Sequence, residues 1–155
     1  MTPAAVGGVA SYLDVRYAAK ARPYTPYPRQ LTAYLTEAHL GPAAGRRLVD
    51  LGCGRGEFLD GFRAIGFDAV GVDRAVAKDT PSSAPVTVLD YERAPLPFPT
   101  ESVDVVFNKS VLEHVTEITT VLSECHRVLR PGGRMISLVP DWRSQWRHFY
   151  DDWTH

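Results

Sequence analysis

Short apolar runs alternate along this chain with longer stretches in which apolar residues recur every three or four positions. The short runs predict buried strands at 47–51, 69–72, 86–89, 103–107 and 134–139. The longer spacing predicts helices at 30–40, 57–65 and 111–129. Apolar strands that alternate with helices are typical of a parallel sheet covered on both faces. We therefore expect an α/β protein with a doubly wound sheet.

Prolines modify this pattern in two places. Pro95, Pro97 and Pro99 lie between the third and fourth expected strands, and they predict a crossover without a full helix. Near the N-terminus, prolines predict an extended connector over 22–28, because the residue before a proline disfavours helix.

The chain divides into three parts on this evidence. Residues 1–29 form an arm, 30–140 a sheet domain, and 141–155 an aromatic tail. The arm is either loosely packed or a lid over a site. Its tyrosines are Tyr12, Tyr17, Tyr24 and Tyr27.

Composition narrows the class of protein. The 155 residues are 45% hydrophobic and 23% charged, as in one soluble globular domain. The formal net charge of −1 offers no electrostatic basis for binding nucleic acid or a membrane surface, and we expect neither partner. Two cysteines, Cys53 and Cys125, form no C-x-x-C pair and predict neither a disulfide framework nor a metal site. We expect a reduced, cytoplasmic protein.

A glycine-rich turn follows the first strand and leads into a helix. Its glycines, Gly52, Gly54 and Gly56, allow positive φ and let a ligand approach the backbone closely. The helix N-terminus beyond them suits an anionic group. However, Glu57 stands where the dinucleotide pattern requires glycine, and Asp50 adds a second carboxylate. These charges disfavour a diphosphate and favour a ligand that also carries a positive centre.

Five segments follow one another in order: Asp-Leu-Gly-Cys-Gly-Arg-Gly at 50–56, Val-Gly-Val-Asp at 70–73, Leu-Asp-Tyr at 89–91, the stretch 102–115 with Val-Leu-Glu-His-Val, and His-Arg-Val-Leu-Arg-Pro-Gly-Gly at 126–133. Together, over about residues 47–140, they resemble the class I S-adenosylmethionine-dependent methyltransferases of the type 11 subgroup. The resemblance implies a Rossmann-like, mostly parallel sheet of five strands in the order 3-2-1-4-5. The family's last two strands would be absent.

The resemblance also implies a reaction. S-adenosylmethionine would be the cofactor and S-adenosylhomocysteine the product. The methyl group would pass by in-line displacement to a small-molecule acceptor, and positioning would supply most of the acceleration.

Site residues follow from the same resemblance. Gly52, Gly54, Gly56 and the backbone of Cys53 would line the methionine end of the cofactor. Asp73 would hold the ribose with Arg74 beside the adenine, and Asp90 and Tyr91 would flank the adenine. Asn108, Lys109 and Ser110 would face cofactor and substrate. Asp50 either pins the turn or faces the amino group of the cofactor, and Asp73 and Asp90 could instead be simple turn residues.

The resemblance assigns no catalytic residue. Glu113 and His114 are candidates for a general base, although either could serve only for packing. Cys53 is interpreted as a small loop residue and not as a nucleophile.

The C-terminal part leaves several alternatives open. The aromatic residues Trp142, Trp146, Phe149 and Trp153 share one helical face, which either packs on the sheet or forms a substrate wall or a dimer surface. Five arginines are either a solvated face or steer an anionic substrate; they are Arg127, Arg130, Arg134, Arg143 and Arg147. The tail resembles methyltransferases of polysaccharide and glycan biosynthesis, which implies a sugar-like acceptor.

An exposed edge of the fifth strand predicts association, and we expect a homodimer. Other functions stay open at this point. The chain could be a non-catalytic cofactor-binding subunit or a truncated methyltransferase, either of which would need a partner. An NAD-dependent oxidoreductase is a further alternative, which Glu57 disfavours.

Overall fold

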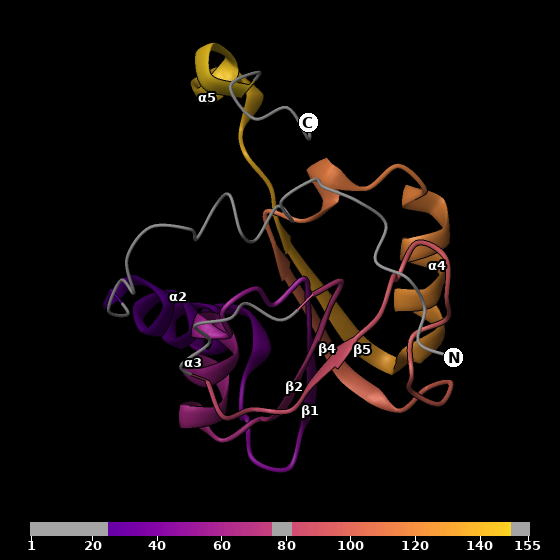
Figure 1. Ribbon diagram of the computed structural model, residues 1–155. Coiled ribbons are helices and arrows are strands. Elements are labelled where there is room, and N and C mark those ends of the chain that lie inside the picture. The colour runs from indigo at the N-terminus through magenta and orange to yellow at the C-terminus, as the bar shows by residue number, and fades with distance from the viewer. Residues whose placement is uncertain (1–24, 76–81, 150–155) are drawn as a thin grey trace.

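A computed structural model describes residues 25–75 and 82–149 (Figure 1). Its elements in chain order are α2 (Tyr27–Leu35), η1 (Thr36–Leu40), β1 (Arg47–Leu51), α3 (Glu57–Ile65), β2 (Asp68–Asp73), β3 (Val86–Val88), β4 (Val103–Lys109), η2 (Leu112–His114), α4 (Ile118–Val128), β5 (Leu129–Leu138) and α5 (Trp142–Phe149). β1 and α3 have the predicted bounds. No helix in this part of the chain is long and apolar enough to cross a membrane.

The five strands form one sheet in the order β3-β2-β1-β4-β5, and all neighbouring pairs are parallel. This confirms the predicted fold class and strand order. β1 is central and pairs with β2 on one side and β4 on the other. The strand order reverses at β1, and in open α/β sheets ligands bind at such a switch point, beyond the carboxyl ends of the strands.

Each face of the sheet carries its own core. α2 and α3 cover one face and α4 covers the other (Figure 1). On the first face, Phe62 of α3 packs on Phe107 of β4, with ring centroids 5.0 Å apart. On the second, Val121 of α4 joins a cluster with Val49 and Val106. Because successive strand residues face opposite sides, a central strand covered on both faces is mostly apolar, and Asp50 is the buried polar exception in β1.

α2, the first helix of the described residues, starts earlier than the sequence predicted. Tyr27 and Pro28 lie in α2, so the predicted extended connector is wrong at these two residues. Proline fits the first helical turn because the amide hydrogen that it lacks has no partner there. The predicted helix 30–40 spans the rest of α2 and η1. Residues 1–24, and with them the choice between arm and lid, lie outside the described residues.

The predicted helix 111–129 is not continuous. It is divided into η2 and α4, and Val115 between them is extended, with φ −95° and ψ 124°. Glu92 Oε2 accepts the backbone N–H groups of both Thr116 and Glu117 at 2.7 Å. This carboxylate comes from a distant loop and satisfies the amides that precede α4. Apolar spacing alone carried no sign of that contact.

β5 also differs from its predicted start, since it begins at Leu129 and not at residue 134. A register shift between Val103 and Val105 accommodates the extra residues, and Gly132 has φ +79° within this bulge. From Arg134 onward the strand pairs regularly with β4, as predicted.

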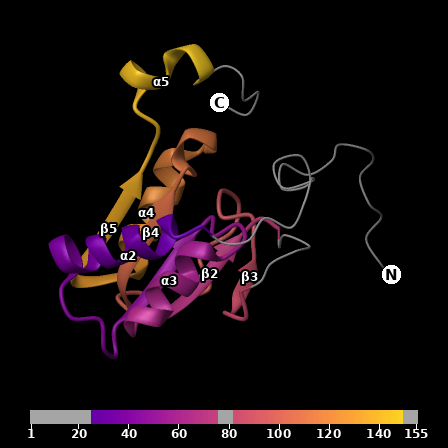
Figure 2. The ribbon, with the colours of Figure 1, turned by 90° about the vertical axis from the view of Figure 1, so that its left-hand side faces the viewer.

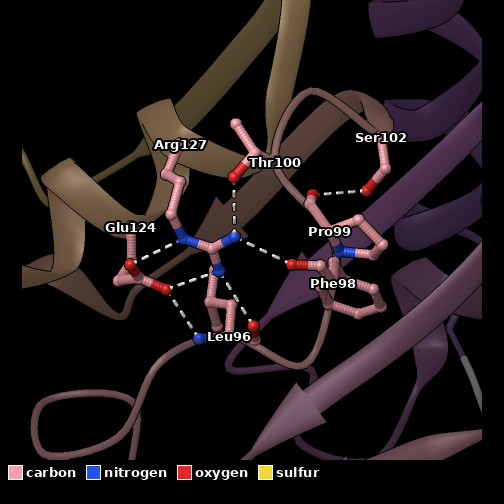
Figure 3. A network of polar contacts seen from close by, with 7 residues as sticks. All are labelled: Leu96, Phe98, Pro99, Thr100, Ser102, Glu124 and Arg127. Carbon is pink, nitrogen blue, oxygen red and sulfur yellow. Dashed lines mark hydrogen bonds and ion pairs between the residues drawn. The ribbon is translucent and has the colours of Figure 1, made fainter.

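The connection from β3 to β4 contains no helix, as its prolines predicted. Arg127 ties it to α4 (Figure 3). Its guanidinium donates hydrogen bonds to Glu124 at 2.8 Å and to the carbonyls of Phe98 and Leu96 at 2.9 and 3.0 Å. Glu124 in turn accepts the N–H of Leu96 at 2.8 Å. Glu124 and Arg127 thus satisfy one N–H and two carbonyls of this connection.

α5 projects beyond the end of β5, away from the rest of the sheet (Figures 1 and 2). Trp142 and Trp146 are 49% and 53% exposed. Packing of these two rings on the sheet is therefore wrong, whereas a substrate wall or dimer surface stays a prediction. Trp153 lies outside the described residues.

We predict that Arg127→Ala lowers the free energy of unfolding by about 1–3 kcal/mol, because it leaves two carbonyls and a carboxylate without their donor. Arg93→Ala in the same connection is the control, since Arg93 is 86% exposed and pairs only at 3.5 Å with Asp90. Its cost should be about 0–1 kcal/mol. Urea denaturation measures both, and equal losses would contradict the role given to Arg127.

Candidate functional site

The turn after β1 is narrow and can be built only from glycine at its first position. Gly52 has φ +74°, and a Cβ there would overlap Cγ2 of Val111. Its N–H donates to the carbonyl of Val72 at 2.7 Å. Gly56 has φ +78° and caps α3, where its carbonyl accepts the N–H of Asp60 at 2.9 Å. The backbone of the turn thus lies beside the carboxyl ends of β1 and β2.

Asp73 ends β2 and faces this turn. Its Oδ2 accepts the N–H of Gly54 at 2.7 Å, and its Oδ1 lies 3.4 Å from the N–H of Ala75. An ionised carboxylate can accept about four hydrogen bonds, so Asp73 retains acceptor capacity. The structure shows that Asp73 pins the turn. Its role toward a ribose stays a prediction.

Asp50 is the most unusual group at the site. It is 2% exposed, and its Oδ2 has no hydrogen-bond partner among the described residues. Burial, and then the charge of Asp73, raises the pKa of Asp50 to about 8. Asp50 is therefore protonated at neutral pH until a cation or a hydrogen-bond donor reaches it. A buried carboxyl oxygen without a partner at the end of the central strand fits a ligand with a cationic group.

This carboxyl predicts a specific pH dependence of stability. The pKa of Asp50 is about 8 when folded and ordinary, near 4, when unfolded. The native state therefore binds the extra proton between these values, and the stability that it contributes falls as the pH rises from about 4 to about 8, by about 1.4 kcal/mol per pH unit. Asp50→Asn does not titrate, so the variant should become progressively more stable than the unaltered protein over this interval. Parallel stability profiles, measured by urea denaturation, would contradict the raised pKa.

Arg74, Asp90 and Tyr91 lie together next to Asp73. The guanidinium carbon of Arg74 lies 4.9 Å from the centroid of the Tyr91 ring, and its Nε lies 3.5 Å from Asp90 Oδ1. Arg74 also forms an ion pair with Glu92. Tyr91 is buried, and burial raises its pKa to about 12, so the phenol stays protonated. Three residues that the sequence predicted for one subsite are thus adjacent.

Glu92 is the member of this group that sequence reasoning missed. It follows Asp90 and Tyr91 directly, but no motif spacing marked it. Only the folded chain shows that it contacts both Arg74 and the amides before α4.

The end of β4 places the third set of predicted residues. Asn108 is buried and donates Nδ2 to Ser137 Oγ of β5 at 2.9 Å, while its Oδ1 has no partner among the described residues. Ser110 has φ +55°, an uncommon conformation for serine, and its N–H donates to Leu138 at 2.8 Å. Lys109 Nζ lies 3.4 Å from Ser110 Oγ. Val111 follows and lies against Gly52, so this segment adjoins the glycine turn.

The two candidates for a general base lie in η2. Glu113 is half-buried, and its Oε2 has no hydrogen-bond partner in the described part of the chain. His114 is half-buried, and its backbone N–H donates to the backbone carbonyl of Val111 at 2.9 Å. Their catalytic role stays a prediction. Within residues 25–75 and 82–149, no group of three or more His, Cys, Asp or Glu side chains could hold a metal ion.

Cys53 behaves as a packing residue. Burial, and then the charges of Asp50 and Asp73, raises the pKa of its thiol. A Cβ at Gly71 would lie 2.6 Å from its sulfur, so the glycine of β2 makes room for the thiol. A thiol that does not ionise is a poor nucleophile, and this favours the interpretation of Cys53 as a small loop residue.

The arginine group is mostly committed to the fold. Arg127 binds Glu124, Arg130 pairs with the buried Asp104, and Arg134 donates to the carbonyl of His39. These three contacts favour a structural role over the steering of an anionic substrate.

Comparison with known sequences shows a consistent relationship. A family described as a methyltransferase domain, of type 11, matches residues 49–137. A Mycolicibacterium smegmatis protein named as a probable S-adenosylmethionine-dependent methyltransferase is 35% identical over 118 residues, covering 74% of this chain and 45% of that protein. A ubiquinone biosynthesis O-methyltransferase of Bradyrhizobium sp. is 34% identical over 110 residues, covering 65% and 43%. The chain thus spans less than half the length of these relatives.

Solved structures agree in fold. An S-adenosylmethionine-dependent methyltransferase from Archaeoglobus fulgidus superposes with a TM-score of 0.70 at 25% identity, covering 83% of this chain and 61% of that one. The PH0226 protein of Pyrococcus horikoshii has a TM-score of 0.68 at 23% identity, covering 93% and 68%. A methyltransferase solved in complex with the Haloferax volcanii Trm112 activator has a TM-score of 0.65 at 24% identity, covering 85% and 62%. The last two likenesses concern the fold alone.

Proposed function

The chain belongs to the type 11 methyltransferase domain family, and from this membership we propose that it binds S-adenosylmethionine beyond β1 and methylates a small molecule. The family implies S-adenosylmethionine as cofactor and S-adenosylhomocysteine as product. The observation that carries the proposal is the buried Asp50 oxygen without a partner, beside the glycine turn that Asp73 pins.

The residues fit the charges of this cofactor. Its ammonium group suits Asp50, whose oxygen lacks a partner among the described residues. Its carboxylate suits the N-terminus of α3, and its ribose hydroxyls suit the remaining acceptor sites of Asp73. Arg74, Asp90 and Tyr91 are proposed for the adenine. Glu57, at the position where the dinucleotide pattern requires glycine, disfavours a diphosphate, which agrees with the family in setting aside an NAD-dependent oxidoreductase.

The bound cofactor supplies an activated methyl group, and the protein has to position and shield it. In-line displacement requires the acceptor on the far side of the methyl group, and a fixed approach supplies most of the acceleration. Asn108, Lys109 and Ser110 lie at the end of β4 next to the glycine turn and are proposed to face both the cofactor and the acceptor. Glu113 or His114 is proposed as base where the attacking atom must lose a proton.

A small-molecule acceptor is supported by the printed names of the relatives. Several are ubiquinone biosynthesis O-methyltransferases, which favours an oxygen as the methylated atom. A sugar-like acceptor rests on the tail alone, and much of the tail lies outside the described residues.

A second candidate is a cofactor-binding domain that needs further protein for activity. It is favoured by the coverage, since the chain spans 45% and 43% of two relatives. Binding of S-adenosylhomocysteine without cofactor consumption would support this candidate over a complete enzyme.

We predict that Asp73→Ala weakens binding of S-adenosylhomocysteine by about tenfold or more in calorimetry, because it removes charged hydrogen bonds to ligand and turn. Asp68→Ala at the start of β2 is the matched control, because Asp68 is exposed and distant from the turn. It should bind like the unaltered protein. Unchanged affinity in Asp73→Ala would disprove the ribose assignment, and tight binding of NAD alone would disprove the proposed function.

We also propose a cytoplasmic homodimer that associates through the outer edge of β5. Within the described part of the chain β5 pairs only with β4, and the neighbouring Val139 is 55% exposed, so the edge can accept a further strand. Cys53 and Cys125 are free thiols, as expected in a reducing compartment. Sedimentation equilibrium should give twice the monomer mass. A monomer at micromolar concentration would rule out the dimer.

A further inference from the structure

We propose that Glu92 positions Arg74 over Tyr91 and ties this pair to the segment that leads into α4. This inference rests on the proposed function, because it assigns a role in cofactor binding. It makes Glu92 a positioning residue that acts through Arg74 and through the backbone, and not a group that touches the reacting atoms.

The two oxygens of Glu92 have different partners. Oε1 forms the ion pair with Arg74, and Oε2 accepts the N–H groups of Thr116 and Glu117, both at 2.7 Å. The side chain is 9% exposed. Charge-assisted bonds are about twice as strong as neutral ones, and a shielded carboxylate with three donors has one preferred placement. Glu92 therefore joins the end of β2 to the segment between η2 and α4.

Arg74 depends on Glu92 for its orientation. Its side chain is 42% exposed and has many rotamers. The other acid beside it, Asp90, is 45% exposed and also pairs with Arg93 at 3.5 Å. Tyr91 by contrast is 7% exposed and packed in the core cluster of the α4 face. The ring is therefore fixed by packing, and the guanidinium over it is fixed chiefly by Glu92.

The same carboxylate bears on the acceptor side of the site. The segment 111–117 contacts the glycine turn at one end, where Val111 lies against Gly52. At its other end Glu92 holds the amides of Thr116 and Glu117. Glu113 and His114 lie between these two anchors. Glu92 thus holds both Arg74, which is proposed for the adenine, and the segment that carries Glu113 and His114, which are proposed for the acceptor.

A double-mutant cycle tests this connection. Glu92→Gln keeps the size of the side chain but removes its charge and places an amide N–H₂ among donors. We expect it to weaken binding of S-adenosylhomocysteine and of 5′-methylthioadenosine by the same factor, about fivefold or more. Because the effect of Glu92 on the nucleoside passes through Arg74, whereas its backbone bonds are followed separately by hydrogen exchange, the loss of affinity should fall below about twofold in the Arg74→Ala background. Two fully additive losses would overturn the inference.

A second measurement follows the backbone directly. Hydrogen exchange at the Thr116 and Glu117 amides should be about tenfold faster in Glu92→Gln than in the unaltered protein, since each amide loses a charged acceptor. Unchanged protection of both amides would show that the segment does not depend on Glu92, and would overturn the inference.

Glu124→Gln is the matched control. Glu124 also holds a guanidinium and a backbone N–H, those of Arg127 and Leu96, and it ties α4 to the connection from β3 to β4 (Figure 3). It should lower the free energy of unfolding and leave ligand affinity unchanged. Equal losses of affinity in the two variants would indicate general loosening and overturn the inference.

The outcomes also separate this inference from the proposed function. If the unaltered protein binds neither ligand, the proposed function fails and this role fails with it. If the unaltered protein and Glu92→Gln bind equally well, this role alone is disproved.

Discussion

The hydrogen bond from the Gly54 amide to Asp73 Oδ2, 2.7 Å long, is the contact on which the site depends. It joins the turn after the central strand to the end of the neighbouring strand. Parallel pairing of β1 with β2 brings these two ends together. Gly52 lets the turn lie close to Val111, because it has no Cβ that would overlap the valine side chain. A turn held in this way presents backbone amides beside two carboxylates, a combination that suits a ligand with both signs of charge.

The electrostatics of the site follow from its burial. Asp50 and Asp73 lie close together in a shielded environment, and the cost of two charges there is avoided while Asp50 keeps its proton. A cationic ligand group removes this cost because it compensates the second charge. We therefore propose that the site selects a positive centre through a carboxyl group that is costly to ionise alone. A diphosphate carries no positive centre that could compensate the charge of Asp50.

Local and central features of the chain could be predicted from the sequence. β1 and α3 have the predicted bounds because their signals are local: an apolar run, a glycine turn and a helix closed by Gly66. The strand order followed from the resemblance to a family whose sheet has that order. The glycines and acids at the strand ends are adjacent, as expected for parallel strands whose carboxyl ends meet at one edge.

Features that depend on distant contacts could not be predicted. The break between η2 and α4 is accompanied by contacts to Glu92, more than twenty residues away, and neither periodicity nor motif spacing encodes such a partner. The early start of β5 depends on a bulge against β4. The prolines predict an extended connector that includes Pro28, although proline is compatible with the first turn of a helix. Each difference arises where tertiary context decides between two locally allowed conformations.

A crystal structure with S-adenosylhomocysteine tests the central claim most directly. The account predicts ligand density above residues 52–56, with the amino group beside Asp50 and the ribose hydroxyls within hydrogen-bond distance of Asp73. An empty turn in crystals soaked at saturating concentration, or the ligand bound elsewhere, would contradict it.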